Sequence, residues 1–339
     1  MSKDDTWFLK GIAILLLLYH HIPYDLELGF VLISGARVCV WIFLFISAYG
    51  FTLQMQEKYE KEPFRFIIKR ILLLYSLTWY FFIFNLIVSI IWDPGLIDYF
   101  KSSVFNLPLE MLGLSNTFGK RLIATDWYVN FLIIVIVIFP LLYHLAKRTS
   151  WFSIPIVVLI TQLIPYKMEF THGGQLNYYL LIVMLAILFA QKRVFEKLEK
   201  FKHKKDFIIS VTSLLLMAVL VVVRYILLPH LKEHWYLSIG PVSTAMAMII
   251  ILDVYFFRTG GMISQLIQKL GKHAGNIFFS HWFFYNYLVF VLKIQNPFLA
   301  YAGCFIYCLS ISLLLEFIKK KNDYNNRIRK GIKLLLRED

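Results

Sequence analysis

The sequence predicts an all-α integral membrane protein, a bundle of about ten transmembrane helices with both termini in the cytoplasm. Of its 339 residues, 59% are hydrophobic and only 17% are charged, whereas an average soluble domain has about 25% charged residues. Long apolar runs recur from one end of the chain to the other, and many approach the length that crosses a bilayer. Composition and pattern therefore agree on a polytopic helical protein.

The apolar runs define ten predicted helices in one transmembrane domain, residues 1–318, which a basic cytoplasmic tail, 319–339, follows. The predicted spans are 7–22, 30–54, 68–92, 127–146, 151–166, 175–191, 207–228, 235–257, 275–293 and 298–318. The outer segment 93–126 is long and mixes aromatic with polar side chains, which suits either a sugar or the membrane interface.

Basic residues set the orientation. With the N-terminus in the cytoplasm, most of the 35 lysines and arginines fall in cytoplasmic segments, above all in 192–205 and 319–339. This asymmetry is the positive-inside pattern. It accounts for most of the net charge of +14, so that charge indicates contact with anionic lipid headgroups and gives no argument for nucleic acid.

Lys10 and His21 are polar residues within the first apolar run, LKGIAILLLLYHHI. At about 100° per residue, their separation brings them onto one helix face, about 16 Å apart along the axis, while His20 points about 80° away. The predicted orientation puts Lys10 at the cytoplasmic end and His21 toward the outer side. Titratable groups inside a bilayer are costly and tend to line a site or a pathway.

Each of these side chains has two interpretations. His21 either accepts a proton from a hydroxyl as a general base or makes a hydrogen bond near the interface. Lys10 either binds a phosphate or carboxylate at the cytoplasmic face or snorkels to set the topology. His281 should lie about 10 Å below the cytoplasmic edge of its helix, which makes it a further site candidate, whereas His273 is expected at the interface.

Other charged residues lie at helix ends. Lys69 and Arg70 open the third helix and could hold a nucleotide-like phosphate or fix its topology. Arg37 opens the second helix from the outside. Asp253 and Glu316 are acids near cytoplasmic ends, expected to pair with basic residues. The sequence has no P-loop, no dinucleotide-binding glycine motif and no Cys/His metal spacing, so we predict neither a metal nor a tightly bound cofactor.

Five motifs in order resemble the acyltransferase 3 family, the multi-pass bacterial membrane O-acyltransferases that modify surface glycans. The matching elements are Lys10-Gly11-Ile12-Ala13 with His21, Arg37 through Gly50, Lys69-Arg70, Trp127-Tyr128 with Pro140, and Gly271-Lys272 through His281. The chain departs from the family pattern at three positions: Lys10 replaces the initial arginine, Ala48 the usual glycine and Ala274 the usual serine. These departures leave the handling of the substrate open.

The resemblance implies an acyl donor, usually acetyl-CoA, bound from the cytoplasm, and an acceptor hydroxyl on a lipid-linked or polymerised glycan at the outer side of the bacterial plasma membrane. His21 would be the base or the acyl-relay residue, with Lys10 and His281 as further catalytic candidates. Lys10, Lys69, Arg70 and Arg37 would form the donor side of the site. Direct attack by the acceptor hydroxyl and a covalent acyl-histidine both remain open.

Three other functions compete with transfer of an acetyl group. A succinyl or another short acyl group would need the same machinery. Ten helices with buried charges also fit a transporter or flippase for a lipid-linked glycan, and a non-catalytic membrane scaffold is the third possibility. Partners expected in every case are membrane lipids; the sequence does not reveal the oligomeric state.

Overall fold

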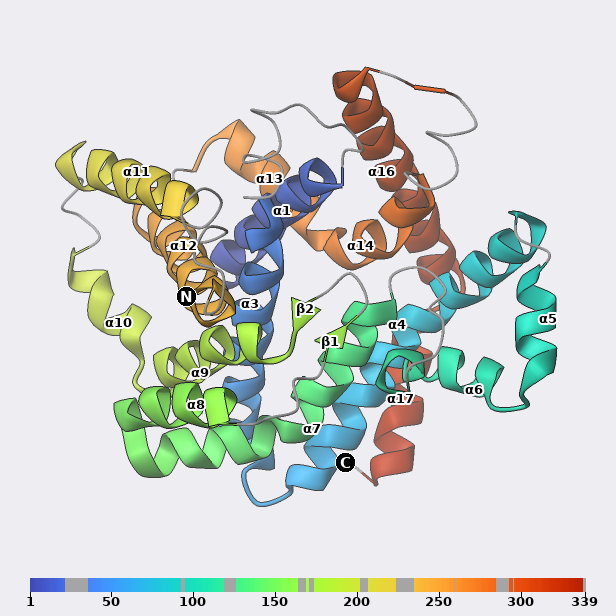
Figure 1. The fold of residues 1–339 in the computed structure, drawn as a ribbon, viewed down its shortest axis with the longest axis horizontal. Helices are drawn as coiled ribbons and strands as arrows, with labels where there is room; N and C mark the ends of the chain where they lie inside the picture. Colours follow the sequence, from blue (N-terminus) through green and yellow to red (C-terminus); the bar gives the residue numbers. More distant parts are fainter. Residues whose placement is uncertain are drawn as a thin grey trace.

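The fold is that of a helical bundle (Figure 1). The computed structural model describes residues 1–21, 36–92, 95–118, 126–163, 169–170, 174–201, 207–223, 235–258, 260–284, 293–294 and 296–337. In chain order the helical elements are α1 (Lys3–His20), η1 (Ala36–Val38), α3 (Cys39–Gln54), η2 (Met55–Tyr59), α4 (Pro63–Trp92), α5 (Gly95–Ser102), α6 (Asn106–Met111), η3 (Ser115–Phe118), α7 (Asp126–Thr149), η4 (Ser150–Phe152), α8 (Ser153–Leu163), α9 (Asn177–Gln191), α10 (Val194–Leu198), η5 (Glu199–Phe201), α11 (Phe207–Val222), α12 (Trp235–Phe257), α13 (Met262–Lys272), α14 (Ala274–Phe283), α16 (Pro297–Lys321) and α17 (Tyr324–Leu336). Two short strands, β1 (Glu169–Phe170) and β2 (Gly174–Gln175), pair antiparallel.

Every predicted span contains a helix, which confirms the helical membrane class. In the described part of the chain, five helical stretches are long and apolar enough to cross a membrane. They are Ala36–Tyr59, Pro63–Ile83, Trp127–Thr161, Gly240–Phe257 and Pro297–Lys321. The count of ten crossings and the cytoplasmic position of both termini stay predictions.

Several helices lie where the sequence analysis placed none. The predicted outer segment 93–126 contains α5, α6 and η3. The segment between the predicted spans 235–257 and 275–293 contains α13. The predicted domain boundary at residue 318 falls inside α16, and the basic tail forms α17. Both α13 and α17 repeat apolar residues at helical spacing between polar ones, which in α17 are mostly lysines and arginines, so they are amphipathic and escape a search for long apolar runs.

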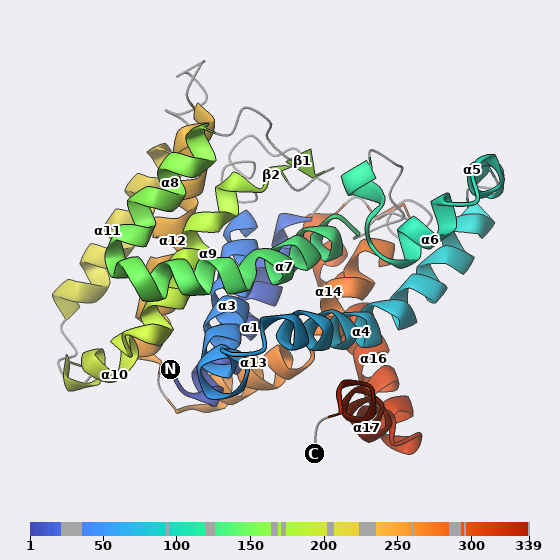
Figure 2. The ribbon, with the colours of Figure 1, turned by 90° about the horizontal axis from the view of Figure 1, so that it is seen from below.

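The core is built around α3, which packs against α1, α9 and α12 (Figure 2). Its Trp41 and Phe45 side chains are fully buried. The Trp41 indole donates to the carbonyl of Tyr178, 3.2 Å away, and its ring lies 4.6 Å from that of Tyr179 on α9. Aromatic contacts of this kind add packing energy beyond area burial and fix α3 against α9.

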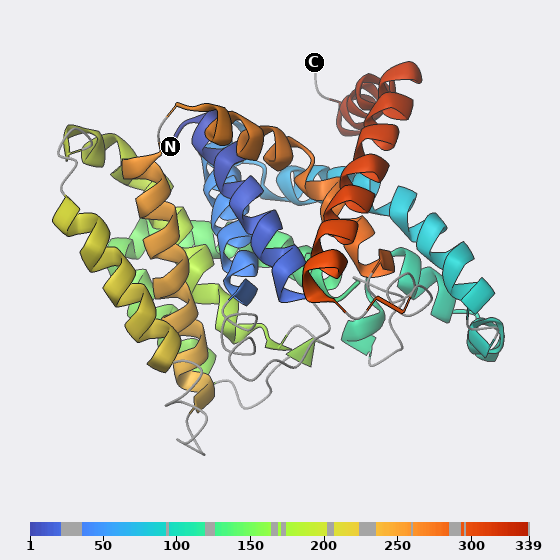
Figure 3. The same ribbon diagram turned by 90° about the horizontal axis from the view of Figure 1, so that it is seen from above.

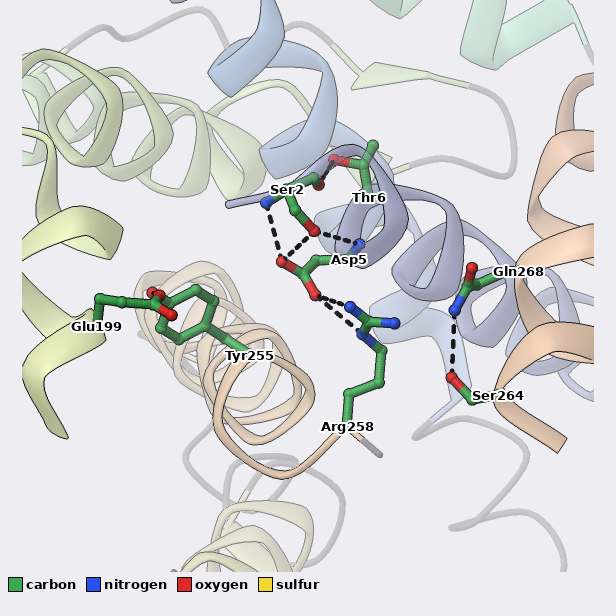
Figure 4. A network of polar contacts seen from close by, with 8 residues as sticks. All are labelled: Ser2, Asp5, Thr6, Glu199, Tyr255, Arg258, Ser264 and Gln268. Atoms are coloured by element: carbon green, nitrogen blue, oxygen red, sulfur yellow. Dashed lines mark hydrogen bonds and ion pairs between the residues drawn. The ribbon is translucent and has the colours of Figure 1, made fainter. Parts of the chain in front are cut away.

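A polar network anchors the start of α1 (Figure 4). Ser2 and Asp5 form a capping box, in which each side chain bonds the backbone amide of the other. Asp5 also accepts from Arg258 at the end of α12, with one oxygen 2.7 Å from Nη2 and 2.9 Å from Nε. Burial raises the pKa of Asp5, but the hydrogen bonds from Ser2 and the charge of Arg258 outweigh it and leave the pKa below its ordinary value.

We expect Asp5→Asn to destabilise the protein by about 2 kcal/mol at neutral pH, because it removes charge-assisted hydrogen bonds. A group with a lowered folded pKa contributes stability above its ordinary pKa of about 4 and loses it as the pH falls further. The thermal midpoints of wild type and variant, measured in detergent, should therefore converge in acid. Asp4→Asn, an exposed neighbour in the same turn, is the control. If the two thermal midpoints differed by the same amount at all pH values, the lowered pKa of Asp5 would be contradicted.

Candidate active site

Two glycines hold α1 against α13, and this contact sets the frame of the site (Figure 3). A Cβ added to Gly271 would lie 1.8 Å from the carbonyl oxygen of Trp7, and one added to Gly11 would lie 2.1 Å from that of Ile267. Only glycine permits backbones to approach this closely. From the contact between Trp7 and Gly271, α1 leads to His21 and α14, after His273, leads to His281.

The two helices bring His21 and His281 together. Their ring centroids are 4.7 Å apart, with the rings tilted by 47°. The His20 ring lies 5.0 Å from that of His21, edge to face. The sequence analysis named the two histidines as separate candidates, and this ring contact joins them in one site.

The hydrogen bonding of His281 fixes its tautomer. The side chain is only 2% exposed, and its Nδ1 lies 2.5 Å from the carbonyl oxygen of Phe278. Because a carbonyl only accepts, Nδ1 carries the proton in the neutral ring, and Nε2 keeps its lone pair. Nε2 is buried and has no hydrogen-bond partner among the described residues. An imidazole in this state can accept a proton but has none to give at that nitrogen.

Aromatic side chains surround this nitrogen base. The Phe278 ring lies 5.8 Å from the His281 ring and 4.8 Å from the ring of Tyr128 on α7. Tyr128 belongs to the Trp127-Tyr128 pair that the sequence analysis matched to the family pattern; it is 8% exposed. The surroundings of the histidine pair are thus largely apolar, which strengthens hydrogen bonds and charge interactions made there.

Lys10 lies on α1 well before the histidine pair. The helix is unbroken from Lys3 to His20, so the expected separation of about 16 Å along the axis holds. Lys10 is half-buried, and its ammonium has no ion-pair partner within the described ranges. A desolvated cation without a carboxylate suits an anionic ligand, although no contact joins Lys10 to the other predicted cations.

Lys69 and Arg70 lie in an aromatic setting at the start of α4. The Lys69 ammonium donates to the Tyr59 hydroxyl, 2.6 Å away, and lies over the same ring. The Arg70 guanidinium stacks 4.8 Å from the ring centroid of Phe51 and 5.7 Å from that of Phe66. Its buried Nε has no hydrogen-bond partner in the part of the chain that the structure describes. Cation–π contacts stabilise the charge but do not neutralise it.

Arg37 lies apart from these cations, on η1. This turn packs against α1 and α12. The backbone carbonyl of Arg37 accepts from the thiol of Cys39, 3.7 Å away. The structure thus brings together the two histidines and, separately, Lys69 with Arg70, and it leaves Lys10 and Arg37 on different elements.

Sequence reasoning missed a buried network beneath His281 that joins α14 to α16. The Asn276 amide donates to Ser312 Oγ at 3.0 Å and to Glu316 Oε1 at 2.9 Å. Lys319 donates to Asn276 Oδ1 and Glu316 Oε1, each at 3.1 Å, although its side chain is largely buried. The spacing of Ser312, Glu316 and Lys319 along one helix face was the available signal.

The expectations for the remaining polar groups have mixed outcomes. Glu316 pairs with a basic residue, as predicted, but Asp253 instead accepts from the hydroxyl of Ser213, 2.9 Å away. His273, which is expected at the interface, is half-buried, and its Nδ1 lies 2.8 Å from Ser312 Oγ.

The family model for the acyltransferase domain matches residues 8–317. The chain belongs to the acyltransferase 3 family. The match spans nearly the whole chain and contains both histidines of the pair and the two close-packed glycines. Membership of this acyltransferase 3 family indicates a membrane acyltransferase. No curated protein and no solved structure matches the chain.

Proposed function

We propose that this acyltransferase 3 protein transfers an acetyl group from cytoplasmic acetyl-CoA to a hydroxyl of a cell-surface or lipid-linked polysaccharide, in the plasma membrane of a bacterium. The observation that supports it most is the contact between His21 and His281 inside a family of acyltransferases. Transfer to a hydroxyl needs a group that removes its proton, and a neutral imidazole serves at neutral pH.

The chemistry can be written with the residues present. The acceptor oxygen attacks the thioester carbonyl and its proton passes to an imidazole nitrogen; the carbon–sulfur bond breaks, and the proton returns to the leaving thiolate. The lone pair on Nε2 of His281 or the adjacent ring of His21 can take that proton. If His21 attacks first, an acyl-imidazole forms and the acceptor hydroxyl resolves it. Both routes yield an O-acyl ester and free CoA.

The cations support an anionic donor. Arg70 has its Nε unpartnered within the described part of the chain, and Lys10 has no carboxylate beside it there. The phosphates of a CoA ester would supply the missing counter-charge. Lys69 stands next to Arg70 and could add a second contact. We therefore assign Lys10, Lys69 and Arg70 to the donor side, with Arg37 as a supporting cation.

The decisive experiment is chemical analysis of the surface glycan from cells with and without this protein. Mass spectrometry of the glycan before and after mild alkali, which cleaves esters, should find alkali-labile acetyl groups only when the protein is present, while the amount of exported glycan stays the same. If the ester-linked group were succinyl, the proposal would change only in the identity of the acyl group. Unchanged acylation together with lost export would overturn the proposal in favour of a flippase.

A further inference from the structure

The C-terminal helix α17 packs along one face of α4, a feature that is independent of the proposed function. The two helices lie side by side (Figures 1 and 2), and the contacts at their ends show that they run in opposite directions. Near one end, Arg65 donates to the carbonyls of Leu336 and Arg337, at 2.7 and 3.0 Å. Near the other, the Tyr324 hydroxyl donates to the Ser76 carbonyl, 2.7 Å away.

An open groove of about 440 Å³ lies along these two helices. Its α4 wall is a stripe from Leu72 to Ile83, in which Tyr75 and Trp79 stack with ring centroids 5.4 Å apart. Their polar atoms bond elsewhere: the Trp79 indole donates to the Met111 carbonyl at 2.9 Å. The ring faces are thus left as apolar surface, and the volume falls in the range of about 300–1,000 Å³ typical of small-molecule sites.

The other wall, α17, is basic and amphipathic. Its sequence YNNRIRKGIKLLL has Arg327 before Ile328, Arg329 and Lys330 after it, a further cation at Lys333, and no acid. Leu334 and Leu335 are 82% and 65% exposed. A helix with this pattern lies in the plane of the membrane interface, its cations among the headgroups and its apolar residues among the acyl chains. Arg327 lines the groove itself.

We propose that the groove binds one anionic phospholipid of the bilayer, with an acyl chain along the Tyr75–Trp79 wall and the phosphate at Arg327. Charge selects the headgroup: the groove lining contains one cation, Arg327, and no carboxylate. The predicted orientation assigns this tail to the cytoplasmic side. The lipid would then hold α17 against α4, the helix that contains Lys69 and Arg70.

Trp79 provides the probe. The purified full-length protein is placed in nanodiscs of phosphatidylcholine that contain dibrominated phosphatidylglycerol or, in parallel, dibrominated phosphatidylcholine. Bromine quenches nearby indoles, and subtracting the signal of a Trp79→Phe variant isolates Trp79 from the other seven tryptophans. We expect half-quenching of Trp79 at an about fivefold lower fraction of the anionic lipid. Equal quenching by both lipids would overturn the proposal.

Two variants separate the groove from the general charge of α17. Arg327→Gln should abolish the preference for the anionic lipid, whereas Arg329→Gln, the same charge change on an exposed residue outside the groove, should keep it. Gly331 lines the groove, and a Cβ there would meet nothing within 4 Å. Gly331→Phe should therefore fold normally and block quenching by filling the groove. A specific site would be contradicted if Arg327→Gln and Arg329→Gln lost the preference for the anionic lipid equally. Full quenching of Trp79 in Gly331→Phe would contradict it as well.

Discussion

Replacing His21 by alanine is expected to lower acyl transfer by about 10²–10⁴-fold, the usual contribution of a positioned acid–base group, or to abolish it if an acyl-histidine forms. The same range applies to His281→Ala, because the two rings are 4.7 Å apart and Nε2 of His281 is held as an acceptor. Transfer would be measured in membrane vesicles with radiolabelled acetyl-CoA and purified glycan, at protein levels matched by immunoblot.

Two further variants make this test specific. His20→Ala removes the adjacent ring, which lies 5.0 Å from His21, and should keep most of the activity. His281→Asn can still donate to the Phe278 carbonyl but has no nitrogen base in place of Nε2, so it should fold like the wild type and remain inactive. If His20→Ala abolishes transfer and His21→Ala does not, the helix-face argument has selected the wrong ring. An active His281→Asn would mean that Nε2 takes no proton.

The sequence alone predicted the helical membrane class because long apolar runs indicate segments that are buried in lipid. It also identified His21 and His281 as candidates, but as separate residues on the first and ninth predicted helices. Their contact depends on Gly11 and Gly271, which are far apart in the chain and meet only in the folded bundle. Spacing within one helix reveals which residues share a face; it does not reveal which other helix covers that face.

The amphipathic helices α13 and α17 are the second feature that the sequence analysis did not predict. In α17, Ile328, Ile332 and Leu335 repeat at helical spacing, and the same holds for Ile263, Leu266 and Leu270 in α13. Lysines and arginines in α17, and serine, glutamines and a lysine in α13, interrupt the apolar run, so a search for long apolar stretches passes over both helices. A test for periodicity would have found them. It would still not have shown the groove against α4 or the backbone contact with α1.

Gly271→Ala is expected to produce the largest loss of stability among conservative substitutions in the described bundle. The added methyl would lie 1.8 Å from the Trp7 carbonyl oxygen and 2.9 Å from the Gly11 amide nitrogen. Both are backbone atoms, which cannot rotate away, so α13 must move from α1. Overpacking of this kind costs about 1–3 kcal/mol, against a gain of about 0.5–1 kcal/mol from replacing a helical glycine. We expect a lower thermal midpoint in detergent and weaker transfer.

The matched control is Gly50→Ala, since Gly50 also lies inside a helix but a Cβ there meets nothing within 4 Å. Its midpoint should stay unchanged or rise. Gly11→Ala should resemble Gly271→Ala, because its methyl would lie 2.1 Å from the Ile267 carbonyl oxygen. The thermal midpoint of the double variant should fall by less than the sum of the two single decreases, since either methyl already separates the same two helices. Equal midpoints for Gly271→Ala and Gly50→Ala would show that α1 and α13 do not pack through their glycines, and the frame that joins His21 to His281 would then need another cause.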